Sequence, residues 1–133
     1  MTVPFPLPAV APETETFWTG GADGRLRITA CNACDHRIHP PQLICPRCLS
    51  RDVEARPASG KGTVATFTIN RQAWVPGLAV PYAIGIVELD DQPGVRITAR
   101  ILAETVECVA IGAAVEVAFE KNDDVFIPVF RLV

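Results

Sequence analysis

The sequence is poor in the residues on which catalysis and membrane insertion usually depend. Its 133 residues include only two histidines, one tyrosine and one methionine. It contains neither the Gly-x-Ser-x-Gly elbow of serine hydrolases nor the Gly-x-Gly-x-x-Gly loop that cradles phosphates. No apolar run approaches the ~20 residues of a membrane-spanning helix, because prolines and charges interrupt the richest stretches. No catalytic constellation is therefore visible, and a membrane-spanning helix is excluded.

Basic residues are absent from the start of the chain. Secretory leaders begin with a basic segment, so residues 1–12 predict no leader, and we expect a cytoplasmic protein. Four prolines alternate with apolar residues in this segment and favour an extended arm. Because the arm is itself apolar, we expect it to lie along a neighbouring surface. Residues 13–19 then predict a short helix, which Gly20 and Gly21 end.

The formal charge of −3 hides an uneven distribution along the chain. Between Arg25 and Lys61 there are seven basic residues and three acids, so that segment carries a local charge of +4. The remainder therefore carries −7. A basic segment on an acidic body suits a phosphorylated ligand or an acidic protein surface, although the arginines could equally serve only to solvate a loop.

Four of the five cysteines form two Cys-x-x-Cys pairs, Cys31/Cys34 and Cys45/Cys48, separated by ten residues. Each tight turn aims two thiolates at one point, and two such turns supply the tetrahedral four-sulfur site that zinc prefers. A zinc ion held by four cysteines has no open position for a substrate. The spacing therefore predicts a structural Zn²⁺ site that folds a segment too polar and proline-rich to build a core.

Three other interpretations of these cysteines stay open. Disulfides would require an oxidising compartment, which the odd fifth cysteine and the missing leader disfavour. A thioredoxin-like redox centre would require one pair at the start of a helix, but Pro40, Pro41 and Pro46 oppose a long helix. Iron is the third, because four thiolates also hold an iron atom or a cluster.

Three polar residues of this segment have expected roles other than primary ligation. His36 and His39 could replace a cysteine, but with four thiolates present we expect them to be loop residues or to support the ligands. Asp35 follows the second cysteine, where such a turn often needs positive φ, a conformation that Asp tolerates less easily than Gly.

From residue 60 onward the sequence has the alternating pattern of β-strands. Five runs separated by turn signals predict strands over residues 63–74, 82–89, 95–102, 115–120 and 126–132. In the fourth we expect Val115, Val117 and Phe119 to point inward and Glu116 and Glu120 outward. Residues 103–111 are long enough for a helical turn between the third and fourth strands. This order is typical of an OB-fold; another small β-barrel or sandwich is the alternative.

The predicted fold class is mostly β, with an N-terminal helix and a zinc ribbon followed by a five-stranded OB-fold barrel. Short strands over 25–29 and 53–56 enter and leave the cysteine segment. We expect three parts: the N-terminal arm and short helix over residues 1–24, the zinc ribbon over 25–59 and the barrel over 60–133.

The loop over residues 72–81 joins the first two predicted barrel strands, where OB-folds commonly receive ligands. Trp74 in this loop could stack on an adenine, seal a subunit interface or simply pack in the core. Arg96 and Arg100, like Arg71 before the loop, could meet phosphates or only solvent. The candidate ligand or interface residues are Trp18, Arg71, Trp74 and Tyr82.

Two other features are interpreted as structural. Cys108 has apolar neighbours and no spare histidine, so we expect a small buried hydrophobic residue and not a nucleophile. Gly60-Lys61-Gly62 is interpreted as the hinge between ribbon and barrel, because a lone glycine pair is a weak phosphate signal.

A series of short motifs runs along nearly the whole chain: Phe17-Trp18 with Gly24 and Leu26, Cys31, Cys34, Cys45-Pro46-x-Cys48, Gly60-x-Gly62-Thr63-Val64, Pro81-Tyr82, Val87-x-Leu89-Asp90, Ile111-Gly112, Val115-x-Val117 and Pro128-x-Phe130. Together they resemble the acyl-CoA-associated OB-fold family with an N-terminal rubredoxin-like zinc ribbon, long catalogued as domain of unknown function thirty-five. Two departures are Asp35, where glycine is common, and the glycines at 20 and 21, which weaken the preceding helix.

The resemblance implies a non-catalytic accessory subunit of a thiolase-like enzyme acting on acyl-CoA thioesters. Similar proteins accompany aldolases of steroid side-chain degradation, acyl-transferring thiolases and enoyl-CoA hydratase-like subunits. In that family the partner usually holds the catalytic residues, while the OB module provides interface and could help to hold the CoA tail. The alternatives are a single-stranded nucleic-acid binder, an accessory subunit of an enoyl-CoA hydratase, and a free-standing thioesterase or hydratase using Glu88 or Asp90 as base.

Overall fold

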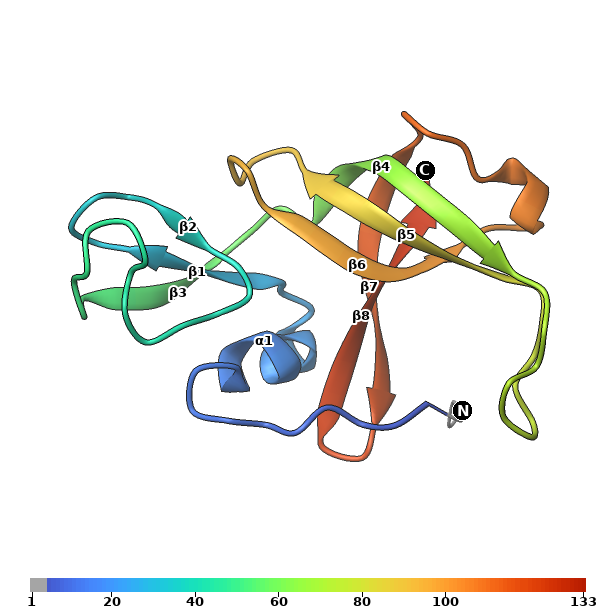
Figure 1. Cartoon of the computed structure of the whole chain (residues 1–133), viewed down its shortest axis with the longest axis horizontal. Coiled ribbons are helices and arrows are strands. Elements are labelled where there is room, and N and C mark those ends of the chain that lie inside the picture. Colours follow the sequence, from blue (N-terminus) through green and yellow to red (C-terminus); the bar gives the residue numbers. More distant parts are fainter. Residues whose placement is uncertain (1–4) are drawn as a thin grey trace.

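The computed structural model describes residues 5–133, which form two lobes side by side along the long axis of the molecule (Figure 1). The smaller lobe contains strands β1 (Arg27–Cys31), β2 (Arg37–Ile38) and β3 (Val53–Pro57), in the antiparallel order β2-β1-β3. The predicted strands beside the cysteines are confirmed, although the first begins at Arg27 and not at Arg25. Strand β2 was not predicted, because two residues between a cysteine turn and a proline pair carry no periodicity.

The larger lobe is a closed five-stranded barrel. Its strands are β4 (Lys61–Asn70), β5 (Tyr82–Leu89), β6 (Arg96–Leu102), β7 (Ala114–Asn122) and β8 (Val125–Leu132). They follow the order β4-β5-β6-β8-β7, and β7 closes the barrel by pairing with β4. Only the β6–β8 pairing is parallel. The 3₁₀ turn η2 (Val106–Cys108) lies between β6 and β7, so the OB-fold prediction is confirmed.

The two lobes share one hydrophobic core. Fully buried side chains from β5 to β8, among them Val87, Val115 and Phe130, fill the barrel. Leu26 and Ile28, at and beside the start of β1, belong to the same cluster of buried residues. Because the ribbon contributes side chains to the barrel core, the orientation of the two lobes is set by packing.

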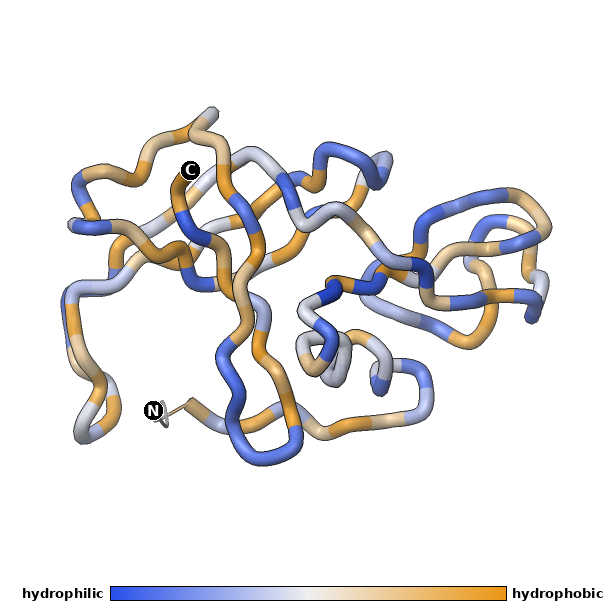
Figure 2. The backbone as a smooth tube through the Cα atoms, turned by 180° about the vertical axis from the view of Figure 1, so that it is seen from behind, coloured by the Kyte–Doolittle hydropathy of each residue, from blue (hydrophilic) through white to orange (hydrophobic). Residues whose placement is uncertain are grey.

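The alternation predicted for the fourth barrel strand is only partly correct. Val115 is buried as expected, but Val117 and Phe119 are half-buried, and so is Glu120, which was expected to face water. The β7–β8 hairpin extends beyond the barrel wall; its turn and the end of β7 are hydrophilic, whereas the start of β8 is apolar (Figure 2). Its projecting part packs against the N-terminal elements and not only against the core.

The N-terminal helix begins two residues later than predicted and ends where it was predicted to end. Helix α1 begins at Glu15 and ends at Thr19, with Gly20 as its C-cap. The chain then continues into the 3₁₀ turn η1 (Gly20–Asp23), which was not predicted and which Gly24 ends with φ 71°. A Cβ atom at Gly21 would lie 2.7 Å from Cγ of Phe119, so this glycine allows η1 to approach the β7–β8 hairpin closely. None of the helices described for residues 5–133 is long and apolar enough to cross a membrane.

Gly62 in β4 lies where strands β4 and β5 approach each other closely. A Cβ atom there would lie 2.6 Å from Cγ1 of Val87 and 2.7 Å from the carbonyl oxygen of Glu88. Gly62→Ala should therefore lower the free energy of unfolding by about 1–3 kcal/mol, because the backbone of β5 cannot yield. Urea denaturation measures this, with Thr68→Ala on the exposed face of the same strand as control, expected to change it by less than about 0.5 kcal/mol. Equal stability of the two variants would contradict the packing described.

Candidate functional site

Two backbone turns of the same design present the cysteine pairs. In the first, the N–H of Asp35 donates to the carbonyl of Cys31 (2.8 Å), and the N–H of Cys31 donates to the carbonyl of His36 (2.9 Å). In the second, the N–H of Leu49 donates to the carbonyl of Cys45, and the N–H of Cys45 donates to Ser50, both at 2.9 Å. Asp35 and Leu49 occupy equivalent positions with φ of 65° and 64°. The expected positive φ at Asp35 is confirmed.

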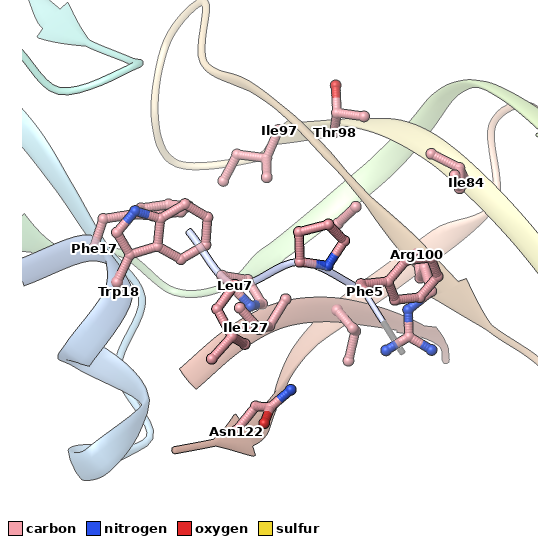
Figure 3. A pocket seen from close by; sticks show the side chains of 14 residues that line it. Phe5, Leu7, Phe17, Trp18, Ile84, Ile97, Thr98, Arg100, Asn122 and Ile127 are labelled. Atoms are coloured by element: carbon pink, nitrogen blue, oxygen red, sulfur yellow. The ribbon is translucent and has the colours of Figure 1, made fainter. Parts of the chain in front are cut away.

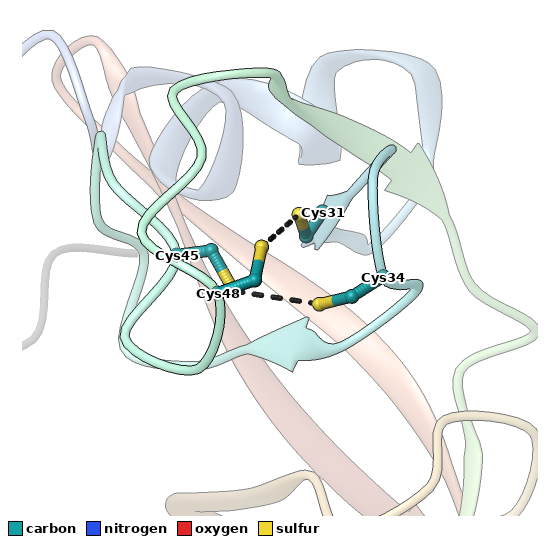
Figure 4. Close-up of side chains that lie close together, drawn as sticks. All are labelled: Cys31, Cys34, Cys45 and Cys48. Atoms are coloured by element: carbon teal, nitrogen blue, oxygen red, sulfur yellow. Dashed lines mark hydrogen bonds between the residues drawn. The ribbon is translucent and has the colours of Figure 1, made fainter.

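The two turns bring their four sulfur atoms together (Figure 4). All four Sγ atoms lie within 4.8 Å of one another, with Cys31–Cys48 at 3.5 Å and Cys34–Cys45 at 3.7 Å. A tetrahedral zinc with Zn–S bonds near 2.3 Å places its sulfurs roughly 3.8 Å apart, whereas a disulfide needs about 2.05 Å. Cys31, Cys34, Cys45 and Cys48 therefore form a metal-binding group, and the donor set fits zinc.

The electrostatics of the free thiols show why a cation belongs here. Burial alone would raise the pKa of the Cys45 thiol, but hydrogen bonds from the backbone N–H groups of Cys48 and Arg47 outweigh it and lower this pKa to about 7. For Cys48, the backbone N–H of Ser50 alone would lower the pKa of the thiol, but the neighbouring thiols outweigh it and raise this pKa to about 12. Four sulfurs this close cannot all ionise without a positive charge among them. A bound divalent cation supplies that charge.

Neither histidine belongs to the metal-binding group. His39 packs against Phe17 of α1, with ring centroids 5.0 Å apart, and burial lowers the pKa of its imidazole. His36 contributes its backbone carbonyl to the first cysteine turn. His39 therefore connects the ribbon to the N-terminal helix.

Asp35 and two arginines hold the first cysteine turn and attach it to the barrel. The carboxylate of Asp35 pairs with Arg56 (2.9 Å) and Arg37 (3.0 Å), and both arginines lower its pKa. Arg37 also donates to the side chain of Gln92 (2.8 Å), a buried residue of the β5–β6 turn. The aspartate at a position where glycine is common therefore has an electrostatic role within the chain.

An apolar pocket lies between the N-terminal arm and the barrel (Figure 3). Its volume is about 270 Å³. The arm contributes Phe5 to Leu7, α1 contributes Phe17 and Trp18, and the opposite side comes from β6 and the β7–β8 hairpin. Sequence reasoning expected the arm to lie on a surface but did not identify this pocket, because its walls come from segments far apart in the chain.

The far end of the arm is held by aromatic and charged groups. The ring of Phe5 meets Tyr82 edge-on at 5.8 Å, and the guanidinium of Arg100 lies 5.5 Å from the centre of the same ring. Arg100 also forms an ion pair with Glu120, and burial lowers the pKa of its guanidinium. Phe5 thus lies over β5 and β6, the face on which OB-folds usually receive ligands.

The four candidate ligand residues fall into two places. Trp18 lines the pocket and Tyr82 contacts the arm, whereas Arg71 and Trp74 lie in the exposed β4–β5 loop. Strand β4 ends at Asn70, so Trp74 is not in a strand; it is 71% exposed, and its Nε1 donates to Asn70 (3.2 Å). Packing in the core, one of its possible roles, is excluded.

One sequence interpretation is corrected by this geometry. Cys108 is exposed and not buried, because η2 turns Val109 into the core in its place. The Gly60–Gly62 segment spans the start of β4, just after β3, where the ribbon meets the barrel, and the carbonyl of Gly60 accepts from the N–H of Val117 (2.8 Å). Alternating hydropathy cannot reveal which side of a 3₁₀ turn faces the core.

Comparison with known proteins identifies the family. Residues 18–54 match the rubredoxin-like zinc ribbon domain of ChsH2, and residues 55–120 match its C-terminal OB-fold domain. A DUF35 domain-containing scaffold protein of Methanothermobacter thermautotrophicus is 32% identical over 72% of each chain. This chain belongs to the DUF35 family. The expected resemblance and the zinc ribbon are both confirmed.

One further curated relative and two solved structures are informative. The 3-oxo-4,17-pregnadiene-20-carboxyl-CoA hydratase alpha subunit of Mycobacterium tuberculosis is 32% identical over 84% of this chain, which spans only about a third (35%) of that relative's length. Among solved structures, a chain of the Ltp2-ChsH2(DUF35) aldolase superimposes with a TM-score of 0.85 at 27% identity, covering 95% of this chain and 98% of that one. A DUF35 protein of unknown function from Sulfolobus solfataricus shares the fold, with a TM-score of 0.66 at 16% identity.

The four-cysteine site predicts the metal content of the purified protein. The purified protein should contain one zinc per chain, and Cys45→Ser should lose it and unfold the ribbon, because zinc binding contributes on the order of 10–16 kcal/mol to folding in zinc-finger peptides. Cys108→Ser is the matched control and should keep its full zinc content. Elemental analysis with circular dichroism measures both. Iron in place of zinc, or a folded ribbon without metal, would contradict this assignment.

Proposed function

We propose that this chain is a non-catalytic accessory subunit of a thiolase-like enzyme that acts on acyl-CoA thioesters by aldol cleavage or acyl transfer. The observation that carries the proposal is the superposition of nearly the whole chain on a chain of the Ltp2-ChsH2(DUF35) aldolase, an enzyme named for two components. The two lobes and their relative orientation are common to both chains, so the surface available to a partner has the same general form.

The pocket supports a role without catalysis. Its lining, within residues 5–133, includes one titratable side chain, Arg100, which is already paired with Glu120. Arginine stays protonated in proteins and cannot exchange a proton as a general acid or base does. Glu88, one of the two acids considered as a base, lies on the exposed face of β5 beside Arg96 (3.7 Å) and not in a pocket. The division into arm and helix (1–24), ribbon (25–59) and barrel (60–133) is part of this proposal.

The exposed β4–β5 loop is proposed as the part of the barrel that meets CoA or the partner. Trp74 offers an indole face to solvent, and Arg71 forms no ion pair within the part of the chain that the structure describes. An aromatic face and a free guanidinium suit an adenine and a phosphate, or the rim of a protein interface. Trp18 lines the pocket beside the arm and Tyr82 contacts Phe5 of the arm. We propose that these two residues position the arm and do not contact the ligand directly.

An accessory role beside an enoyl-CoA hydratase is the second candidate. The relation to the hydratase alpha subunit of Mycobacterium tuberculosis favours it, since that match includes 84% of this chain. Nucleic-acid binding is disfavoured, because Phe5 covers the β5–β6 face on which a single strand would stack.

Reconstitution tests the proposal. The chain should be co-expressed with each thiolase-like and each hydratase-like protein of its own genome, and every pair tested for a stable complex. We expect one thiolase-like partner whose aldol-cleavage or acyl-transfer rate rises at least about tenfold in the complex, while this chain alone is inert, because the partner supplies the reacting groups. Turnover by the isolated chain, or the absence of any thiolase-like partner, would contradict it.

A variant of the β4–β5 loop separates CoA binding from subunit binding. If Trp74 stacks on the adenine, Trp74→Ala should raise the KM for the CoA thioester about tenfold or more without weakening the complex, since one base–aromatic stack contributes roughly 1–3 kcal/mol. If it lies in the interface, the same variant should weaken the complex instead. Thr68→Ala serves as the control, and a variant with unchanged KM and unchanged assembly would remove Trp74 from the site.

A further inference from the structure

The second cysteine turn sets the backbone conformation of Leu49, but contacts within the part of the chain that the structure describes do not explain its leucine side chain. Leu49 lies in this turn at φ 64°, a conformation that a bulky side chain rarely adopts and that glycine adopts freely. Its side chain is nevertheless 74% exposed, so burial does not offset the unfavourable backbone conformation. An exposed apolar residue that is kept in an unfavourable backbone conformation points to contact with another molecule, and not to a role in stabilising this chain.

The equivalent position of the first turn shows what an internal role looks like. Asp35 has nearly the same φ, 65°, and its carboxylate pairs with Arg37 and Arg56. Asp35 therefore stabilises the ribbon from within. Leu49 makes no comparable contact: among the described residues its recorded interaction is the backbone hydrogen bond to Cys45.

The surroundings of Leu49 form a surface of defined character. Leu43 and Ile44, just before Cys45, are 58% and 40% exposed, and hydrogen bonds from Cys45 to Ser50 and from Leu49 to Cys45 join the two ends of this loop. We define the ribbon tip as these three apolar residues together with the two exposed arginines beside them: Leu43, Ile44, Arg47, Leu49 and Arg51.

The two arginines of the ribbon tip carry free positive charge. Six other arginines of the chain form ion pairs, but within residues 5–133 neither Arg47 nor Arg51 does. Asp52, which follows Arg51 in the chain, accepts a hydrogen bond from Asn32 (3.0 Å) and forms no ion pair with either arginine. The ribbon tip is therefore an apolar patch bordered by two arginines that have no ion-pair partner among residues 5–133.

From this geometry we infer that the ribbon tip is a docking surface for the partner enzyme, and that it fits an apolar patch bordered by carboxylates. This inference rests on the proposed function and specifies the partner's surface. Complementary charge at the rim sets orientation and speeds association, while the exposed leucines supply apolar burial. A second copy of this chain fits less well, because a twofold contact through the same patch would place the basic rims of both copies against each other.

The test measures binding of the reconstituted thiolase-like partner to variants of the full chain. Leu49→Gly keeps the backbone conformation and removes only the side chain, so it should weaken binding at least tenfold while the melting temperature stays the same or rises. Arg47→Glu with Arg51→Glu should weaken binding by a similar factor and reduce its dependence on salt. Ile111→Ser, at a 69% exposed site in the barrel, and Arg25→Glu are the matched controls and should stay within twofold.

Each result of this binding experiment either supports or overturns the inference. Loss of binding in the ribbon-tip variants alone supports the inference. Full binding by Leu49→Gly overturns it and leaves the proposed function standing. Failure of the unmodified chain to bind any thiolase-like protein overturns the proposed function and this inference with it. Self-association of the chain that Leu49→Gly abolishes, measured by sedimentation, would assign the surface to a second copy and also overturn the inference.

Discussion

Repulsion among four sulfur atoms, and the cation that relieves it, is the constraint on which the rest of this structure depends. The loops that carry Cys31, Cys34, Cys45 and Cys48 are mostly polar and exposed, and the only buried cluster of their own consists of Cys31, Cys45 and Ile38, with Val53 packed against it. Within residues 5–133, this cluster is too small to offset the conformational entropy of ordering the cysteine loops. The metal replaces a hydrophobic core there, and it fixes both cysteine turns in one relative position.

The order imposed by the metal reaches the barrel through two kinds of contact. Leu26 and Ile28 insert into the barrel core, and Arg37 joins Asp35 at the cysteine turn to Gln92 between β5 and β6. The ribbon is therefore held at a fixed angle. The ribbon tip and the β4–β5 loop consequently project at opposite ends of the long axis (Figure 1). A partner that used both would contact the full length of the chain.

The arm explains why the usual ligand face of the OB-fold is not the most accessible surface. Phe5 contacts Tyr82 and Arg100, and Trp18 and the β7–β8 hairpin line the pocket beside the arm. The face is occupied by the chain's own apolar residues. Other exposed apolar and aromatic residues lie away from this face, in the β4–β5 loop and at the ribbon tip.

Much of the fold was predictable from the sequence, because the signals that specify it are local. Alternation along single strands located all five barrel strands, and the cysteine spacing located the metal-binding group. The errors arose where the three-dimensional arrangement overrides local preference. Glu120 was expected to face water but pairs with Arg100 of β6, a partner distant in sequence that periodicity does not encode. Cys108 was expected to be buried, but the 3₁₀ turn η2 exposes it and buries Val109 instead. Gly20 ends α1 as predicted, whereas the 3₁₀ turn that follows, close to Phe119, was not predicted.

Hydrogen exchange of the full chain with and without a zinc chelator tests the central claim most directly. The account predicts that the amides of Cys31, Cys45 and Leu49, which close the two cysteine turns, lose protection when the metal is removed, while amides of β5 and β7 in the barrel stay protected. Equal protection of the cysteine-turn amides in the metal-free chain would show that the ribbon holds its shape without the cation, and would contradict the account.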